Sequence, residues 1–267
     1  MASWVIVGAG YTGGAVVRRL AAEGHEVVAT RRSPGSTPGT SNPGSTPDDG
    51  TIALDLAQPP ARTFPGAIVV CCAPPGGDPA LEIQHLVELG GRRIVYVSST
   101  GVYAPGGGAW VDESWPLAPV TRSGRARLEA ERALPVGAAI LRVAGIHGPG
   151  RGLVERLRAG TYRIIGDGRA HVSRIHVDDL VETIIRAGLS TATGAFNVAD
   201  DDPAPIGEVA DALAAKLGVP PPPRVAASSV DPEVAGMLTA DRRIANGRIK
   251  AELGVVLRYP SWRAALG

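Results

Sequence analysis

A glycine-rich motif between two apolar segments, close to the start of the chain, constrains the fold more than any other feature. The apolar run at residues 5–7 leads directly into Gly8-Ala9-Gly10-Tyr11-Thr12-Gly13, an amphipathic stretch follows, and a second apolar run occupies residues 26–30. Glycines in a G-x-G-x-x-G turn let the backbone approach a pyrophosphate, and the following helix offers its free N–H groups to that anion. The pattern predicts a dinucleotide-binding βαβ unit, with cofactor contacts from Gly8, Gly10, Tyr11, Thr12 and Gly13.

The end of the second apolar run indicates which dinucleotide is bound. Thr30 is followed by Arg31 and Arg32, and no acidic residue occurs before Asp48. NAD sites place an acid here for the ribose 2′-hydroxyl, whereas a 2′-phosphate calls for a cation. We therefore expect NADP(H) rather than NAD(H). The alternative interpretation is that the two arginines are a solvated charge pair in a loop.

The composition of the chain limits the kinds of partner that the protein can bind. The formal net charge of +1 argues against nucleic acid or an anionic membrane as the main partner. No apolar run approaches the ~20 residues that a membrane helix needs, and the first strand starts too early for a signal peptide. Cys71 and Cys72 are adjacent in one apolar run and face opposite sides of a strand, so we expect packing roles in a reducing cytoplasm. The five histidines lack ligand spacing, so no metal site is expected.

Strand and helix signals alternate along the chain. The expected strands cover residues 4–7, 26–30, 51–54, 67–72, 93–98, 138–143 and 195–198, and the expected helices cover 13–22, 79–89, 122–134, 153–159, 179–189 and 206–217. Most of the strands are continuous apolar runs, as in parallel sheets that are covered on both faces. This predicts an α/β fold with a doubly wound parallel (Rossmann) sheet. Residues 33–50, rich in Ser, Pro and Gly, are expected to form a long mobile loop. This loop either closes over the adenosine or is an insertion without a role in binding.

Distinctive residues follow several of the expected strands. Ligands of such sheets bind at the carboxyl ends of the strands, so these residues are predicted to line one crevice. Asp55 could bond the adenine amino group, and a rim of small residues after the fourth strand would let the cofactor lie close. For any single position, ordinary turn chemistry is the alternative. The expected further contacts are Asp55, Ala73, Pro74, Ser98, Val143 and Gly145.

Four stretches resemble the extended short-chain dehydrogenase/reductase superfamily, the branch of nucleotide-sugar epimerases and dehydratases. They are VSSTGVY at 97–103, LRVAGIHGPG at 141–150, RIHVDDL at 174–180 and FNVADD at 196–201, in the family's order. With the glycine motif they span about three quarters of the chain. The ending YPSWR at 259–263 resembles a short, atypical subgroup of NAD(P)-dependent epimerase/dehydratase-like proteins.

The family's active site uses a Ser or Thr after the fifth strand and a Tyr-x-x-x-Lys on the next helix. By this resemblance Ser99 takes the first position, Ser123 stands where the catalytic tyrosine is expected, and Arg127 stands at the lysine. A serine hydroxyl is a far weaker acid than tyrosine, whose pKa is about 10. Arginine stays charged and cannot shuttle a proton, but it can hold the nicotinamide ribose and stabilise negative charge. The standard alcohol dehydrogenase chemistry is thus in doubt.

Either another group supplies the proton or the substrate needs little acid catalysis, as with a protonated imine or an activated alkene. The candidate donors are Tyr103, His147, and Ser99 through water. Tyr103 could instead pack beneath its loop, and His147 could be an ordinary turn residue. Arg151 and Arg174 could bind an anionic substrate, with surface salt bridges as the alternative for both.

The resemblance places the dinucleotide-binding domain at residues 1–149 and 174–200, and a small C-terminal substrate lobe at 150–173 and 201–267. The lobe is too short for a whole nucleotide sugar. The favoured function is an NADP(H)-dependent reductase of a small carbonyl, imine or sugar-like substrate with a non-standard proton donor. An epimerase or dehydratase, and a catalytically silent NADP(H)-binding sensor, are the alternatives. A homodimer paired through residues 79–89 and 122–134 is expected by resemblance alone.

Overall fold

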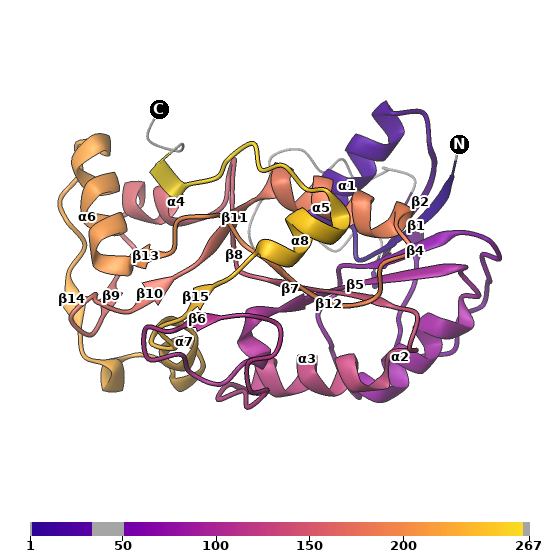
Figure 1. The fold of residues 1–267 in the computed structure, drawn as a ribbon, viewed down its shortest axis with the longest axis horizontal. Coiled ribbons are helices and arrows are strands. Elements are labelled where there is room, and N and C mark those ends of the chain that lie inside the picture. Colours follow the sequence, from indigo (N-terminus) through magenta and orange to yellow (C-terminus); the bar gives the residue numbers. More distant parts are fainter. Residues whose placement is uncertain (1, 34–50, 264–267) are drawn as a thin grey trace.

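A seven-stranded parallel sheet forms the centre of the protein. The computed structural model describes residues 2–33 and 51–263, so the loop expected at 33–50 lies almost wholly outside the described residues. Figure 1 shows the sheet with helices on both faces. In sheet order its strands are β12 (Gly194–Val198), β7 (Ala139–Val143), β5 (Arg93–Ser99), β4 (Ile68–Cys71), β1 (Ser3–Val7), β2 (Glu26–Arg31) and β3 (Ile52–Ala53). The order reverses between β1 and β4, so the doubly wound α/β fold is confirmed.

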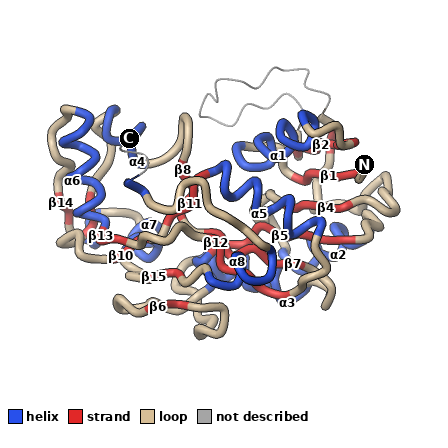
Figure 2. The backbone as a smooth tube through the Cα atoms, turned by 45° about the horizontal axis from the view of Figure 1, so that its top comes forward, coloured by secondary structure: helices blue, strands red, loops and turns tan. Residues whose placement is uncertain are grey.

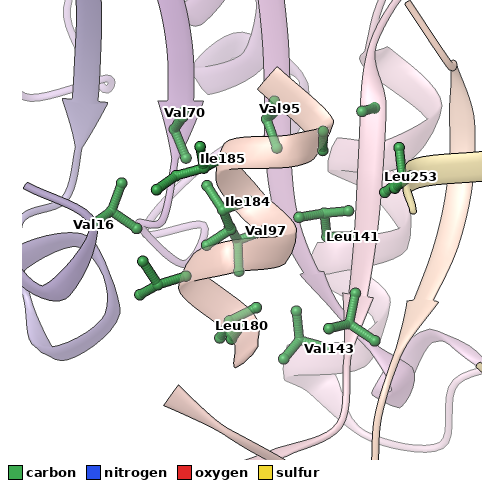
Figure 3. Close-up of a cluster of buried hydrophobic side chains, with 14 of the residues drawn as sticks. Val16, Val70, Val95, Val97, Leu141, Val143, Leu180, Ile184, Ile185 and Leu253 are labelled. Carbon is green, nitrogen blue, oxygen red and sulfur yellow. The ribbon is translucent and has the colours of Figure 1, made fainter. Parts of the chain in front are cut away.

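Alternating residues of β1 belong to two separate apolar cores, one on each face of the sheet. Trp4 and Ile6 pack under α1 (Tyr11–Ala22) and α5 (Val177–Leu189), whereas Val5 and Val7 pack against α2 (Pro79–Glu88). Figure 3 shows part of the first core, where Ile184 and Ile185 of α5 meet Val70, Val95 and Leu141 of the sheet. Because both faces are buried, the strands must be apolar throughout, and each large side chain contributes about 1.5–3 kcal/mol.

Cys71 and Cys72 lie on opposite sides of this sheet, as their adjacency predicts. Cys71 belongs to the core beneath α2, and Cys72 packs against the core beneath α5. Both thiols are free, and burial raises the pKa of Cys71 to about 11. Neither is therefore a reactive thiolate near neutral pH.

Local signals fix the helix ends. Asp78 caps α2 with bonds from Ala80 and Leu81 N–H, and Thr121 caps α3 (Arg122–Ala133) through Gly124 N–H. The helix α6 (Ile206–Leu217) ends at Gly218 in the left-handed conformation and has the expected bounds. The helices α2 and α3 pack side by side on one face of the sheet, and pairing of two copies through them stays a prediction.

The C-terminal segments form a smaller lobe beside the carboxyl ends of the strands (Figure 2). Its core joins α4 (Leu153–Arg158) to α6 around Tyr162, Ile164 and Trp262. Sequence reasoning set no bounds for α7 (Pro232–Leu238), for α8 (Gly247–Leu253) or for the strands of two or three residues outside the central sheet, because such short elements show no periodicity. These strands are β6 (Trp110–Val111), β8 (Gly145–His147), β9 (Ile164–Ile165), β10 (His171–Val172), β11 (Arg174–His176), β13 (Ala204–Pro205), β14 (Arg224–Val225) and β15 (Arg243–Ile244).

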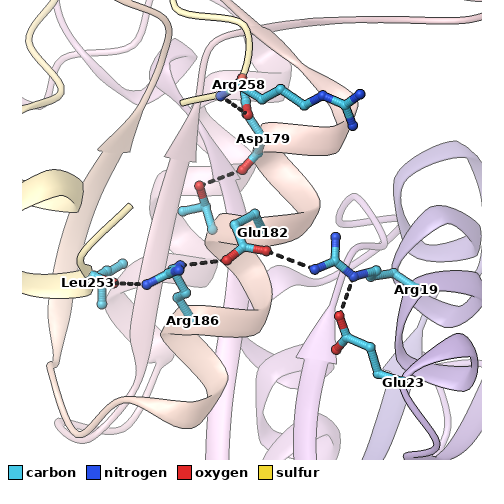
Figure 4. Close-up of polar contacts among 8 residues, drawn as sticks. Arg19, Glu23, Asp179, Glu182, Arg186, Leu253 and Arg258 are labelled. Carbon is cyan, nitrogen blue, oxygen red and sulfur yellow. Dashed lines mark hydrogen bonds and ion pairs between the residues drawn. The ribbon is translucent and has the colours of Figure 1, made fainter. Parts of the chain in front are cut away.

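The chain returns from the lobe to the sheet through α8, where Ile249 and Leu253 join the core beneath α5. Figure 4 shows the polar contacts that hold this face together. Glu182 of α5 accepts from Arg186 at 2.6 Å and from Arg19 of α1 at 3.3 Å. Asp179, 3% exposed, accepts from the backbone N–H of Arg258 at 2.8 Å. The lobe is thus fastened to the dinucleotide-binding unit through α5.

Within residues 2–33 and 51–263, no helix has the length and apolar character to cross a membrane. The same residues contain no group of three or more His, Cys, Asp or Glu side chains placed to hold a metal ion.

Candidate active site

The glycine turn has the shape that a dinucleotide pyrophosphate requires. Gly8 has φ +86°, and a Cβ there would lie 2.8 Å from the backbone nitrogen of Ala73. A Cβ at Gly13 would collide with the carbonyl oxygen of Gly8. Only glycine therefore fits at both places, because the turn is pressed between β4 and α1. The approach of this turn to a pyrophosphate stays a prediction.

The N-terminus of α1 completes an anion cradle. Gly10 is the N-cap residue, no side chain caps the helix, and its first turn contains no acidic residue. The N–H groups and the positive end of the helix dipole are therefore directed at the turn without a competing carboxylate. These features fit a dinucleotide phosphate.

Arg31 and Arg32 lie at the wall of the cleft beside the end of β2. The Arg32 guanidinium lies against Gly76, where any Cβ would collide with it, and its Nε is 3.5 Å from Asp55 Oδ1. Asp55 also caps its own turn through Ala57 N–H. It lies beside Arg32 and is not among the residues that line the cleft, and its contact with the adenine amino group stays a prediction. That ion pair is exposed, and its contribution to stability is small.

One cleft of about 1770 Å³ runs from the glycine turn to the C-terminal lobe. It exceeds the 300–1,000 Å³ of most small-ligand pockets and has room for a dinucleotide and a second molecule. Of the residues predicted from the sequence, those lining it are Gly8, Gly10, Tyr11, Thr12, Gly13, Arg31, Arg32, Ala73, Pro74, Ser98, Ser99, Arg127, Val143, Gly145 and His147.

Ser98 and Ser99 are the last two residues of β5, and both line the cleft. Ser98 is 3% exposed, and its hydroxyl donates to Glu131, so it can reach a cofactor only through its backbone. The Ser99 hydroxyl is half-buried at the cleft wall and accepts from Gly101 N–H at 3.0 Å. Its own proton stays available to a ligand.

The two positions that resemblance assigns to the tyrosine and the lysine have different surroundings. Arg127 lies at the cleft wall, donates to the carbonyl of Val97 and stands 5.9 Å from the centre of the Tyr96 ring. Ser123 is not among the cleft-lining residues, and its hydroxyl donates to Glu233 of α7. Arg127 can therefore meet a cofactor, whereas Ser123 is engaged in holding α7.

Tyr103 does not reach the cleft. Its side chain is 0% exposed, and its hydroxyl donates to Asn197 Oδ1 at 2.7 Å and accepts from Arg142 Nη1 at 3.0 Å. Burial raises the pKa of Tyr103 to about 12 against the opposing effect of Arg142. Arg142 in turn pairs with Glu131 at 2.8 Å. This buried network positions the ends of β5, β7 and β12, and it gives no support to Tyr103 as a proton donor.

His147 lines the cleft next to His176, its register partner across β8 and β11. The two rings are 5.3 Å apart, edge to face, and His176 packs on Tyr259 with ring centres 3.8 Å apart. Burial, together with the nearby His176 and Arg174, lowers the pKa of His147 to about 4. The imidazole is neutral near pH 7, which makes it a poor proton donor there.

Basic residues surround the lobe end of the cleft. Arg151 stacks over the Tyr11 ring at 5.1 Å, and the Tyr11 hydroxyl donates to Pro149 at 3.1 Å. Arg174 is buried at 7% exposure. Neither forms an ion pair within the described part of the chain, so the salt bridges considered as alternatives are not observed.

Three residues important to the cleft were not singled out from the sequence. Glu233 contacts the start of α3 from 110 residues away, and Tyr162 and Trp262 line the cleft from the lobe. The aromatic character of Tyr162 and Trp262 was a usable signal in a chain with only 4% aromatic residues. Nothing local in the sequence distinguishes Glu233.

Comparison with known proteins gives a consistent picture, although no family model matches the chain. The chain is 35% identical over 207 residues to a 3-diazoavenalumate denitrifying reductase from Streptomyces sp, an alignment that covers 68% of each protein. It is 32% identical to a solved, functionally unknown conserved protein from Silicibacter pomeroyi, with a TM-score of 0.74 and coverage of 100% and 97%. The human epimerase family protein SDR39U1, solved with NADPH, shares the fold at 21% identity, TM-score 0.79 and coverage of 100% and 98%.

Proposed function

This chain belongs to the short-chain dehydrogenase/reductase superfamily, in its NAD(P)-dependent epimerase/dehydratase-like branch, and we propose from that premise that it is an NADPH-dependent reductase of a small, electron-poor substrate. That it is an oxidoreductase working with a nicotinamide cofactor follows from the family. The preference for NADPH, the direction of reaction and the substrate class are the proposal.

The preference for NADPH rests on Arg31 and Arg32 at the end of β2. A ribose 2′-phosphate carries two negative charges, which an acidic side chain at this position would repel. A guanidinium instead binds the phosphate with paired hydrogen bonds. Asp55 neutralises Arg32 only through a long, exposed contact of 3.5 Å, so a phosphate can replace it at little cost.

When bound, NADPH supplies a hydride to the substrate. Arg127 is the residue of this chain that would hold the ribose next to the nicotinamide, because it stands at the cleft wall in the family's lysine position. Its fixed positive charge would also stabilise negative charge that develops on the substrate.

A single observation carries the proposal: the residue at the family's tyrosine position, Ser123, is not among those that line the cleft, and its hydroxyl donates to Glu233. A carbonyl-to-alcohol reduction needs a proton at the oxygen as the hydride arrives, and the family's tyrosine supplies it. Ser123 does not reach the cleft, Tyr103 is buried elsewhere, and His147 is neutral near pH 7. Substrates whose reduction needs little acid catalysis fit this site best, with Ser99 passing any required proton from water.

The name of the relative from Streptomyces points in the same direction. By that name it reduces a diazo acid and removes nitrogen from it. The family uses its tyrosine to transfer a proton to a carbonyl oxygen. A reduction that releases nitrogen does not require that proton transfer. We accordingly propose that this chain prefers protonated imines, activated alkenes or diazo compounds to simple ketones and sugars.

The test is NADPH consumption with a panel of small substrates, followed by identification of the products. We expect net loss of NADPH with an iminium, activated-alkene or diazo compound, and at least a hundredfold lower kcat/KM with the ketone of matched size. Isomer exchange without net loss of NADPH would instead support an epimerase. Tight binding of NADPH without turnover of any compound would support a sensor protein.

A further inference from the structure

Four arginine side chains are buried within residues 2–33 and 51–263, and one of them differs from the others in its hydrogen-bond partners. Arg93 donates to three backbone carbonyls, Arg242 donates to three others, and Arg142 pairs with Glu131. Arg174, buried to the same degree at 7% exposure, donates only to the carbonyl of Val172, at 3.0 Å. Its Nη2 has no hydrogen-bond partner within the described residues. Leaving a buried charged donor unpaired is costly, so a partner from outside the chain is the simplest resolution.

Among the acidic residues whose charge acts on Arg174, Asp200 has the largest effect, ahead of Asp202. It does not offset the cost of leaving Arg174 unpaired. Asp200 is 1% exposed, its Oδ2 has no partner within the described residues, and it forms no ion pair with Arg174. Burial raises the pKa of Asp200 to about 7, so its negative charge is incomplete near neutral pH. The guanidinium therefore keeps an excess positive charge.

Arg174 stands at the wall of the cleft, at the end that faces the lobe. It lies on β11, and its register partner on β8 is Gly145, which has no side chain to cover it. Its charge acts on both His147 and Tyr162, which line the same end. The guanidinium is therefore beside the position where a substrate would lie against the cofactor.

A second unpaired donor lines the same part of the cleft. Trp262 is 3% exposed, and its Nε1 has no partner within the described residues. Apolar side chains of α6, those of Ile206, Val209 and Leu213, also line the cleft here. This end of the cleft thus combines an apolar surface with two hydrogen-bond donors that need an acceptor.

We infer that Arg174 binds the carboxylate of a small, hydrophobic carboxylic acid, with Trp262 Nε1 as a second donor and α6 covering the hydrocarbon part. This inference rests on the proposed function, because it assigns the substrate class of that same cleft. A planar carboxylate matches the edge of one guanidinium with two parallel hydrogen bonds.

The test measures binding and not turnover, so its failure is separate from failure of the proposed reaction. Cinnamate and its neutral isostere cinnamamide are titrated into the full-length protein by calorimetry, with and without NADP⁺, and NADPH binding is measured on the same samples. We expect cinnamate to bind at least tenfold more tightly than cinnamamide. Arg174→Met should remove that difference and leave the binding of NADPH unchanged.

Matched variants separate charge recognition from folding. Arg169→Met makes the same charge change at an arginine whose side chain is 89% exposed, and it should bind cinnamate like the unmodified protein. Trp262→Phe keeps the packing and removes one donor, so cinnamate binding should weaken about fivefold. If Arg174→Met does not fold, Arg174→Lys, which keeps the charge but not the paired donors, should still weaken binding severalfold.

The inference is overturned if cinnamate and cinnamamide bind equally, if neither binds, or if Arg174→Met leaves cinnamate affinity intact. Tighter binding of phenyl phosphate than of cinnamate and benzoate would overturn the assignment to carboxylates. A protein that binds cinnamate through Arg174 but does not bind NADPH would retain this inference and lose the proposed function.

Discussion

The backbone N–H of Ser123 donates to Glu233 Oε1 at 2.7 Å, and the Ser123 hydroxyl donates to the same oxygen. The other oxygen of Glu233 accepts from Arg122 N–H at 2.7 Å. A carboxylate from α7 thus sits on the N-terminus of α3, where the helix dipole favours negative charge. The hydroxyl bond from Ser123, followed by the two N–H bonds, lowers the pKa of Glu233. The position at which the family has its catalytic tyrosine serves here to hold a helix over the cleft.

Ser123→Ala should therefore leave kcat nearly unchanged. The two backbone N–H bonds to Glu233 remain in this variant, so we expect KM to rise less than threefold. Glu233→Ala frees α7, and KM should then rise about tenfold, since Gly236 and Met237 of α7 line the cleft. Steady-state kinetics of both variants check this expectation. A hundredfold fall of kcat in Ser123→Ala, with the fold intact, would make Ser123 a catalytic residue.

Arg127→Met should weaken NADPH binding by roughly ten- to a hundredfold, because a hydrogen bond from a charged donor contributes about 1.5–3 kcal/mol. Arg132→Met is the matched control, since Arg132 is exposed at the last turn of the same helix. Calorimetric titration with NADPH measures both. Equal affinities in the two variants would remove Arg127 from the cofactor site.

Tyr103→Phe should reduce stability without affecting the reaction. The variant leaves Asn197 Oδ1 and Arg142 Nη1 without the phenol, and we expect a loss of about 1–2 kcal/mol and a Tm lower by roughly 2–6 °C. Turnover should stay within twofold. If turnover fell tenfold or more while NADPH binding persisted, Tyr103 would be the proton donor after all.

Asp200 should make stability depend on pH. Its pKa rises from an ordinary value of 3.8 to about 7 on folding, chiefly through burial. The folded protein therefore holds a proton that the unfolded chain releases. The stabilisation of the folded state by this proton is complete below the ordinary pKa of Asp200 and is lost as the pH rises through about 7. The side chain of Asp200→Asn stays neutral at every pH. We therefore expect the free energy of unfolding of the unmodified protein to fall by about 2–4 kcal/mol, relative to that of the variant, between acidic and mildly basic pH.

Denaturant unfolding of both proteins at several pH values measures this difference. A constant difference would show that folding leaves the pKa of Asp200 at its ordinary value, so that Asp200 is charged in the folded protein near neutral pH. It would then also neutralise Arg174, which would weaken the case for a substrate carboxylate there.

The parts of the fold that sequence reasoning predicted are those with local causes. The apolar run before Gly8, the turn that forces glycine there, and the period of residues 206–217 are each determined by neighbours in sequence. The helix α5 begins at Val177 rather than 179, because the side chain of His176 caps it through Asp178 N–H. A histidine cap is an uncommon signal, and the expected start followed the first acidic residues instead.

The parts that could not be predicted depend on contacts between distant segments. Tyr103 and Ser123 were placed in the site by position in a motif, but their hydroxyls bond to residues 94 and 110 positions away. Asp55 follows a strand end as expected, yet Arg32 and its own turn engage it. The burial of Arg174 likewise depends on how β11 lies against β8 and the lobe. No local pattern carries that information.

A calorimetric comparison of NADPH and NADH at matched salt, for the unmodified protein and for Arg31→Ala/Arg32→Ala, tests the proposed cofactor preference. We expect NADPH to bind at least tenfold more tightly than NADH, a difference of about 1.4 kcal/mol, and the double variant to lose this preference while its NADH affinity is unchanged. Equal binding of the two cofactors by the unmodified protein, or a preference that survives in the double variant, would contradict the proposal.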